Sequence, residues 1–571
     1  MRYKRILPHW HIVILLILGL STLASAQIQT NVPALKDVFA KDFNIGCLLS
    51  YPHVGFATDP VVAGQSTVVD LNGGYLIKYH MNSMSPGNNM KPIYTVDMTG
   101  SAAAYAAATT QAQKDSINVR PLIAFNGNLI AQLNWAKRQG FTFRGHTLVW
   151  HNQTPGTGFF RTGYSTAGDR LTKAKMTDRL ENYIKEMIRV LHEGWPGLLS
   201  ACDVVNEAMN DNGTDRTDSE WYITFGDNSY IMKAFEFARK YTQLYGETQI
   251  KLYYNDYNTY VSTKADAIVR VVGPIFRAGY VDGLGMQEHD AFSYPTADQW
   301  IATYNKYDTV CTEMAVTELD INTNSGTNTP SASVLTQQAN QYSQLFKCFV
   351  ERSKKSGRGK IISVSKDGLN DQYTFVTNQS TSLWDTKDQC KPAFYAVVDV
   401  GRSYNALDSL IAYAITLQQN KFTAISWTGL TTALSAAQTA KSQNYSVSVS
   451  AATALSAAKD SLNTAVNSLV KTVSDVTALR GDVPKNFALS QNYPNPFNPT
   501  TQIEYSVAKN GYVSLKVYDL LGQEVATLVQ GFQQPGTYRA RFDGSGLGSG
   551  IYLCRLVASD FNETKRLVLL R

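Results

Sequence analysis

The residues between Lys41 and Val400 alternate between strand-like and helix-like stretches, and this alternation constrains the fold more than any other feature of the chain. Short apolar runs predict eight strands, at 43–49, 81–85, 142–150, 202–207, 251–255, 283–287, 315–320 and 361–364. Helical patterns separate several of them, as at 129–138, 179–192 and 229–244. Eight such units predict an α/β fold, a (β/α)8 or TIM barrel, with an insertion in the Ala/Thr-rich stretch 101–112.

Two regions of different composition follow the predicted barrel domain, which we place at residues 27–400. Residues 401–480 are rich in Ala, Ser, Leu and Thr, and their apolar side chains recur at helical spacing, so we expect a small helical bundle or stalk. This segment loosely resembles the FIVAR-type helical modules of exported bacterial proteins. In residues 484–571, short alternating runs separated by Gly and Pro turns predict a small β-sandwich.

Residues 1–26 have the pattern of a secretory signal peptide. A basic start precedes the apolar run 12–20, and Ala24-Ser25-Ala26 forms a small-residue cleavage site, so the mature chain is expected to begin at Gln27. The apolar run is short for a membrane span, and no later segment is apolar enough to cross a bilayer. We therefore expect an exported protein without a transmembrane segment in its mature chain.

The composition of the chain excludes some classes of function. A hydrophobic content of 44% and a charged content of 17% are those of an ordinary soluble globular protein. A net charge of +6 over 571 residues is too small to indicate a nucleic-acid partner. The six cysteines show no CxxC spacing and the histidines lack metal-ligand spacing, so we expect no catalytic metal and no other cofactor, while a structural calcium ion stays open. The sequence leaves the disulfide pairing open.

The predicted strands end in polar side chains, which matters because the functional residues of such a barrel lie at the carboxyl ends of its strands. Five strands contribute, and the candidate residues are His146, Trp150, Gln153, Asn206, Glu207, Asn255, Tyr257, Gln287, His289, Glu318 and Asp320. Amide, imidazole and indole groups of this kind suit a ligand covered in hydroxyl groups. The set therefore predicts a carbohydrate site at the mouth of the barrel.

Two of these residues, Glu207 and Glu318, are the pair of carboxyl groups that retaining glycoside hydrolysis needs. One protonates the departing oxygen and the other attacks the anomeric carbon, at a separation of about 5–5.5 Å. We expect Glu207 in a partly desolvated place as the acid, with Asn206 beside it to hydrogen-bond a sugar hydroxyl. Glu318 has to stay ionised, and His289, held by Asp320, could donate a hydrogen bond to it.

Five sequence motifs, "RGHTLVWHNQTP", "DVVNEA", "KLYYNDYN", "DGLGMQEH" and "TELDI", resemble glycoside hydrolase family 10, the endo-β-1,4-xylanases, in the order of that family. The resemblance covers residues 43–400 and implies Glu207 as acid/base and Glu318 as nucleophile. Asn255 and Asp320 would support the reacting groups from behind. The implied sugar-binding residues are Asn82, Asn88, Lys91, His146, Trp150, Gln153, Asn206, Tyr257, Gln287 and His289. A secreted endo-β-1,4-xylanase acting on xylan is the predicted function.

The sequence departs from the family at several positions that contact sugar. Where the family reads "TPENEMKW", this chain has "SPGNNMKP", so that Gly87 stands in place of a sugar-binding glutamate. Expected tryptophans are replaced at Pro92, Cys202, Asp367 and Phe375. Trp384 is a candidate to compensate for them. These departures keep two alternatives open: the same barrel acting on another β-linked glycan, and a non-catalytic cell-surface protein that only binds glycans.

The last region carries a second resemblance. Its motifs "NYPNPFNP" at 492–499, "VYDLLGQEV" at 517–525 and "SGIYLCRL" at 549–556 are similar to those of the C-terminal sorting domains of type IX secretion cargo. The resemblance implies that the type IX machinery is a partner of this chain. It also implies a route through the periplasm to the cell surface or the medium.

Overall fold

The computed structural model describes residues 28–49, 59–65, 71–374, 376, 379–419, 422, 424–442, 450–469, 476–479 and 483–571. The expected signal peptide and Phe375 lie outside these ranges. The chain divides into two compact units, one extending to Arg402 and the other beginning at Ser403.

The first unit contains a closed barrel of eight parallel strands, and this confirms the predicted fold. The last strand, β11, pairs with both β10 and β1, and this pairing closes the ring. All eight predicted strands are present within a few residues of their expected bounds. They are β1 (Asn44–Leu48), β2 (Ser83–Ser85), β5 (Thr142–Trp150), β6 (Leu199–Asn206), β7 (Lys251–Asp256), β8 (Gly283–Met286), β10 (Glu313–Asn322) and β11 (Lys360–Lys366).

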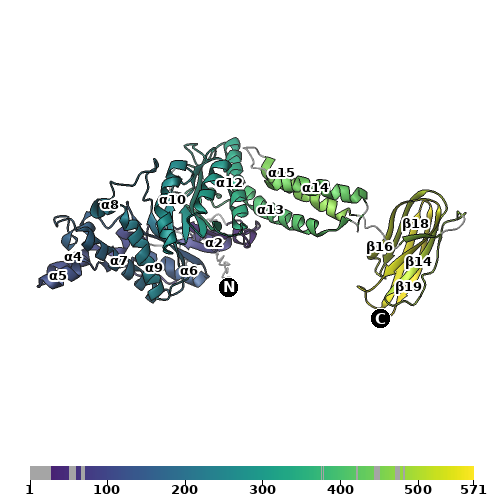
Figure 1. Ribbon diagram of the computed structural model, residues 1–571, viewed down its shortest axis with the longest axis horizontal. Helices are drawn as coiled ribbons and strands as arrows, with labels where there is room; N and C mark the ends of the chain where they lie inside the picture. Colours follow the sequence, from purple (N-terminus) through teal and green to yellow (C-terminus); the bar gives the residue numbers. More distant parts are fainter. Residues whose placement is uncertain are drawn as a thin grey trace, which may run out of the picture. The chain divides into compact units, whose positions relative to one another are not determined.

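Helices surround these strands, as the alternating sequence pattern predicts (Figure 1). The three helices predicted by period are confirmed, and each buries one apolar face; in α7 that face includes Leu180, Ile184 and Met187. The helices that accompany the barrel are α2 (Leu71–His80), α6 (Gly127–Gln139), α7 (Lys173–Gly194), α9 (Ser229–Leu244), α10 (Ser262–Arg277), α11 (Ala297–Tyr307), α12 (Ala332–Ser353) and the first part of α13 (Pro392–Thr416).

The expected insertion is helical. It contains α4 (Met98–Ala107) and α5 (Gln111–Asn118), and a capping box at Thr110 begins the second helix. The buried guanidinium of Arg179 on α7 donates to the carbonyl oxygen of Asn118 over 2.7 Å, which fixes the insertion to the barrel. Shorter elements of this unit are α1 (Leu35–Val38), α3 (Pro92–Thr95), β3 (Val96–Asp97), β4 (Leu122–Ile123), α8 (Glu220–Phe225), β9 (His289–Ala291) and the 3-10 turns Thr157–Phe160 and Thr162–Tyr164.

The second unit begins with helices and ends in a β-sandwich. Its helices are the rest of α13, α14 (Ala424–Ser442) and α15 (Ser450–Asn467), which bury Leu430, Ala437 and Leu462. No helix within the described ranges combines the length and the apolar character that a membrane span requires. The six cysteines of the chain are all free thiols.

Two four-stranded antiparallel sheets form the sandwich and enclose an apolar core that includes Leu515, Phe542 and Leu556. The first strand, β12, lies within the stretch expected to be helical, but it pairs with β17 and so belongs to the sandwich. The sheets contain β12 (Val476–Leu479), β13 (Ala488–Leu489), β14 (Thr500–Val507), β15 (Gly511–Tyr518), β16 (Glu524–Gln533), β17 (Gly536–Asp543), β18 (Gly550–Ala558) and β19 (Phe561–Leu569).

Candidate active site

Glu207 immediately follows β6, at the carboxyl end of the barrel, and its backbone φ of 54° is unusual for a residue with a side chain. Its amide donates to the carbonyl oxygen of Asn255 over 2.9 Å, which fixes this conformation. Three donors reach the carboxyl oxygens: Trp150 Nε1 at 2.8 Å, Gln287 Nε2 at 2.8 Å and Asn206 Nδ2 at 3.2 Å. The group is therefore nearly buried and rigidly oriented.

Glu318 lies on β10, and its carboxylate is held from two sides. Asn255 Nδ2 donates to its Oε1 over 3.1 Å, and His289 Nε2 lies 3.6 Å from its Oε2. Burial alone would raise the pKa of Glu318, but the hydrogen bond from His289 and the nearby positive charges, Lys91 among them, lower this pKa to about 2. Glu318 is therefore an anion at neutral pH, as a nucleophile has to be.

A continuous set of hydrogen bonds joins the two carboxyl groups. Asn255 donates to Asn206 Oδ1 over 2.9 Å as well as to Glu318, and Asn206 in turn donates to Glu207. The amide of Glu318 also donates to the carbonyl oxygen of Gln287, whose side chain donates to Glu207. The fold therefore brings the predicted acid and nucleophile into one network at the mouth of the barrel.

A glycine on β8 leaves room for the centre of this network. A Cβ atom on Gly285 would lie 2.2 Å from Asn255 Oδ1, which is far inside van der Waals contact. Asn255 Oδ1 instead accepts a hydrogen bond from Thr317 over 2.8 Å. Both the amide oxygen and the amide nitrogen of Asn255 are thus fixed by partners, so its side chain can orient Glu318.

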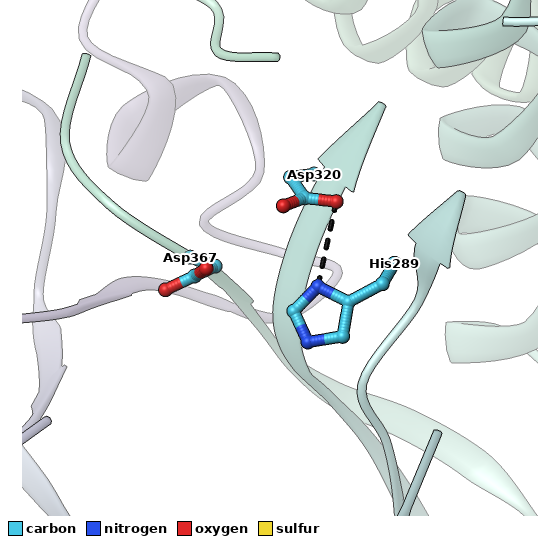
Figure 2. Close-up of side chains that lie close together, drawn as sticks. All are labelled: His289, Asp320 and Asp367. Atoms are coloured by element: carbon cyan, nitrogen blue, oxygen red, sulfur yellow. Dashed lines mark ion pairs between the residues drawn. The ribbon is translucent and has the colours of Figure 1, made fainter. Parts of the chain in front are cut away.

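His289 stands between two acidic side chains, as the sequence predicts. Its Nδ1 lies 3.4 Å from Asp320 Oδ1 (Figure 2). Its Nε2 lies on the side of Glu318, 3.6 Å from Oε2. Burial lowers the pKa of His289, but Asp320 and Glu318 outweigh this effect and raise the pKa well above 6.5. The imidazole is therefore a cation that forms an ion pair with each of the two carboxylates.

A buried ion pair that the sequence analysis missed holds His146. The guanidinium of Arg144 binds both carboxylate oxygens of Asp203, with its Nε 3.1 Å from Oδ2. Asp203 Oδ2 also lies 3.0 Å from His146 Nδ1, which fixes the imidazole ring. Arg144 and His146 stand two residues apart on β5, which was the available signal that they share a side, whereas Asp203 is brought to them by the pairing of β6 with β5.

Lys91, just before α3, joins the site from another loop. Its Nζ donates to Asn88 Oδ1 over 2.7 Å and lies 4.4 Å from the centroid of the Trp150 ring. Burial lowers the pKa of Lys91, while the charges of Glu318 and Glu207 oppose that change. Because the ammonium group covers one face of the Trp150 ring, that face is closed to a sugar ring. The indole N–H group of Trp150 donates a hydrogen bond to Glu207.

The remaining predicted residues lie around the same opening. Tyr257 is half-buried, and its hydroxyl accepts from Arg216, which also donates to the carbonyl oxygen of Glu207. Gln153 has a positive φ of 43° and its carbonyl oxygen accepts from the amide of Ile93, just after Lys91. His151 Nδ1 lies 3.8 Å from Glu207 Oε2. Arg216 and His151 were not predicted to take part.

Asn82 does not belong to this cluster, and we remove it from the candidate residues. It precedes β2, and its Oδ1 accepts from the amide of Ile45 over 2.9 Å. Its carbonyl oxygen accepts from the amide of Thr142, the first residue of β5. These contacts place Asn82 at the amino ends of the strands, where it ties three strands together instead of facing the barrel mouth.

The structure explains one departure from the family pattern and corrects another expectation. Gly87 has a φ of 57°, and a Cβ atom there would lie 2.5 Å from the carbonyl oxygen of Leu49, so the backbone itself excludes a glutamate. Trp384 does not replace the missing tryptophans, because it is fully buried against His80 and Phe394. The sugar-stacking faces of the pattern are thus not restored by this residue.

Residues 35–400 match the family model for glycosyl hydrolase family 10. The chain belongs to glycosyl hydrolase family 10. Residues 491–570 match the model of a secretion system C-terminal sorting domain.

Curated relatives in family 10 include endo-1,4-beta-xylanase Y of Acetivibrio thermocellus, which is 33% identical over 384 residues. That alignment covers 64% of this chain, and the chain spans about a third (32%) of that relative's length. A putative endo-1,4-beta-xylanase of Caldicellulosiruptor saccharolyticus is 33% identical over 305 residues, which cover 52% of this chain and 96% of the relative.

Solved structures agree with this family. The CBM22-1 and GH10 modules of Clostridium thermocellum xylanase 10B, in complex with xylohexaose, are 31% identical with a TM-score of 0.54, and the match covers 64% of this chain and 67% of that one. The intracellular xylanase TsXylA of Thermoanaerobacterium saccharolyticum is 27% identical with a TM-score of 0.52, covering 65% and 100%.

The contacts of Glu318 predict what happens when its imidazole partner is removed. In a His289→Leu variant the carboxylate loses a hydrogen bond and a positive charge, so its pKa should rise by about one to three pH units. Carboxyl NMR titration of 13C-labelled glutamate measures this change. As a control, His192→Leu removes a histidine that binds Glu247 outside the barrel mouth, and it should leave the Glu318 signal unchanged. An unaltered titration in His289→Leu would show that other groups hold Glu318 ionised.

Proposed function

We propose that the chain is a secreted, retaining endo-β-1,4-xylanase that cleaves internal β-1,4-xylosidic bonds of xylan by double displacement. The observation that carries the proposal is the single hydrogen-bonded network that contains Glu207 and Glu318 at the mouth of a family 10 barrel. The relatives named as endo-1,4-beta-xylanases support xylan as the substrate.

In the first step, Glu207 gives its proton to the glycosidic oxygen while a carboxylate oxygen of Glu318 attacks the anomeric carbon. The bond to the leaving sugar breaks and a covalent glycosyl–enzyme ester forms. The low pKa of Glu318, about 2, supports its role as the attacking group. The side chains of Asn206, Trp150 and Gln287 fix the orientation of the acid and limit its contact with water.

In the second step, Glu207, now ionised, takes a proton from a water molecule that attacks the same carbon. The ester bond breaks, Glu318 leaves as a carboxylate, and the product keeps the β configuration because the carbon is inverted twice. His289 is held between Asp320 and Glu318 and stabilises the departing carboxylate.

The residues around the two carboxyl groups supply donors for sugar hydroxyls. Lys91 and His146 sit near enough to Glu318 for their charges to lower its pKa, which supports their assignment to the glycone side. We assign the other sugar contacts to Asn88, Trp150, Gln153, Asn206, Tyr257, Gln287 and His289, with Asn255 and Asp320 as supports behind Glu318.

Another β-linked glycan remains the second candidate substrate, and a specific observation favours it. The backbone at Gly87 leaves no room for the glutamate that the family pattern has there, so a usual sugar contact is missing. Binding without turnover is disfavoured, because a carboxylate held ionised at a pKa of about 2 beside a second carboxyl group serves chemistry.

Substitution of each carboxyl group tests the mechanism. Glu318→Ala should lower kcat on xylan by about 10⁴-fold or more, because the attacking group is gone. Glu207→Ala should lower it by about 10²- to 10⁴-fold, with a smaller loss on an aryl xyloside whose leaving group needs no proton. Release of reducing ends measures both. The exposed residue Glu193 on α7 gives the control Glu193→Ala, with unchanged activity.

A panel of xylan, mixed-linkage β-glucan and mannan separates the candidate substrates in the same assay. Preference for xylan supports the proposal, and preference for another polymer assigns the barrel to the second candidate. An active Glu318→Ala variant, or wild-type protein that binds these polymers without releasing reducing ends, would refute hydrolysis by this site.

We further propose four domains: a signal peptide at 1–26, the barrel at 27–400, a helical module at 401–480 and the sorting domain at 484–571. The match at 491–570 supports export by the type IX machinery to the cell surface or the medium. The strand β12 (Val476–Leu479) pairs with β17 of the sandwich, so the last residues of the range 401–480 belong to the sandwich and not to the helical module.

Removal of the sorting domain tests the proposed export. In a bacterium with a type IX system, a chain truncated just before Val476 should accumulate in the periplasm, because both sheets of the sandwich are gone. Immunoblots of periplasm, cell surface and medium measure its distribution. The full chain should appear outside without its C-terminal peptide. Truncated protein outside the cell, or Arg571 retained on the exported form, would contradict the proposal.

A further inference from the structure

Asp367 is an acidic residue that the mechanism above does not use, and it lies beside the nucleophile. It follows β11 directly, and its amide donates to the carbonyl oxygen of Leu319 on β10 over 3.0 Å. Successive side chains of a strand point to opposite faces. Lys366, the residue before it, reaches Tyr342 on the outer helix α12, so Asp367 faces the inside of the barrel mouth.

Asp367 is nearly buried, yet its carboxyl group lacks a hydrogen-bond partner in the described part of the chain. The residue is 7% exposed, and among the residues that the structure describes no group hydrogen-bonds its side-chain oxygens. The two Asp367 oxygens are accessible to solvent, whereas Asp320 Oδ2 is sealed from solvent without a hydrogen-bond partner. The Asp367 oxygens therefore face the open mouth of the barrel, where a sugar hydroxyl can replace water as their hydrogen-bond partner.

The neighbours of Asp367 place its carboxyl group on the side of Glu318 where the proposed sugar binds. Figure 2 shows its carboxyl group near His289 and Asp320, and the ligand atoms of these three residues lie within 4.8 Å of one another. The family pattern has a tryptophan at this position, so a short polar group stands where a ring would fill space. The charged and titratable groups that interact with it electrostatically are Cys47 on β1, Lys91 before α3, His289 on β9, Glu318 and Asp320 on β10, and, from the outer side of β11, Lys366.

We propose that Asp367 is a further substrate-binding residue, whose carboxyl group hydrogen-bonds a hydroxyl of the sugar on the Lys91 side of Glu318. The inference rests on the proposed glycan hydrolysis. It assigns to Asp367 a hydrogen bond to the sugar where the family pattern has the ring of a tryptophan. A divalent cation fits the same three residues less well, because a histidine has to be neutral to bind a metal. Here the neighbouring carboxylates raise the pKa of His289 well above 6.5.

The contact depends on pH. Burial first, then Asp320 and Glu318, raise the pKa of Asp367 to about 7, against the lowering effects of His289 and Lys366. Below this value the carboxyl group carries a proton and can both donate and accept hydrogen bonds. Above it the group can only accept, so the hydrogen bond that the protonated acid donates to the sugar is lost. Sugar binding should therefore weaken as the pH rises through about 7.

Steady-state kinetics of the full chain on an aryl β-xylobioside, at several pH values, test the contact. At pH 5, Asp367→Ala should raise KM by about five- to tenfold, as for the loss of one hydrogen bond. Asp367→Asn is neutral at every pH and should stay within about twofold of wild type at pH 5. It should also lack the rise in KM of the wild type near pH 7. Glu193→Gln, an exposed control, should behave as wild type.

Binding of xylohexaose to the Glu318→Ala protein, with and without Asp367→Ala, measures the contact without turnover. A five- to tenfold weaker Kd in the double variant supports it even if hydrolysis fails, so the two proposals can fail separately. Three results would overturn it: an unchanged KM and Kd in Asp367→Ala, a wild-type pH profile in Asp367→Asn, or an effect of Asp367→Asn confined to sensitivity towards added Mn²⁺ or EDTA. The last result would assign the three residues to a cation.

Discussion

The hydrogen bonds of Asn255 connect the two halves of the candidate active site. From β7, its amide group reaches Asn206 on β6 and Glu318 on β10, and Asn206 reaches Glu207. Their positions depend on the closed register of the parallel strands, in which Asn206 lies opposite Asn255 and Asn255 lies opposite Gly285. Because Gly285 has no side chain, the amide of Asn255 fits between neighbouring strands. The relative positions of Glu207 and Glu318 depend on this packing.

The electrostatics of the site separate the two carboxyl groups by environment. Glu318 faces the imidazolium of His289 and lies near Lys91, and these charges lower its pKa to about 2 despite burial. Glu207 instead accepts from the neutral side chains of Trp150 and Gln287, and no lysine or arginine forms an ion pair with it among the described residues. Glu318 is thus held as an anion, whereas the hydrogen bonds of the Glu207 carboxyl group come from neutral donors.

The sequence predicted the barrel and most of the site because both follow short-range rules. The period of the apolar residues placed all eight strands, and the rule that function lies at the carboxyl ends selected Glu207, Glu318 and His289. The same rule could not place Asn82. Whether this residue lies before or after its short strand is decided by the pairing of β2 with β1 and β5, which the sequence does not show. The sequence also did not reveal why residue 87 is a glycine. The reason is the close approach of its backbone to the carbonyl oxygen of Leu49, a residue that is distant in the sequence.

Trapping of the covalent intermediate tests the central claim most directly. A 2-deoxy-2-fluoro-β-xylobioside with an activated leaving group should inactivate the enzyme with one label per chain, because the fluorine slows hydrolysis of the ester more than its formation. Peptide mass spectrometry should then find the sugar on Glu318. A label on any other side chain, or active enzyme that releases an α-configured product and forms no adduct, would contradict double displacement by Glu207 and Glu318.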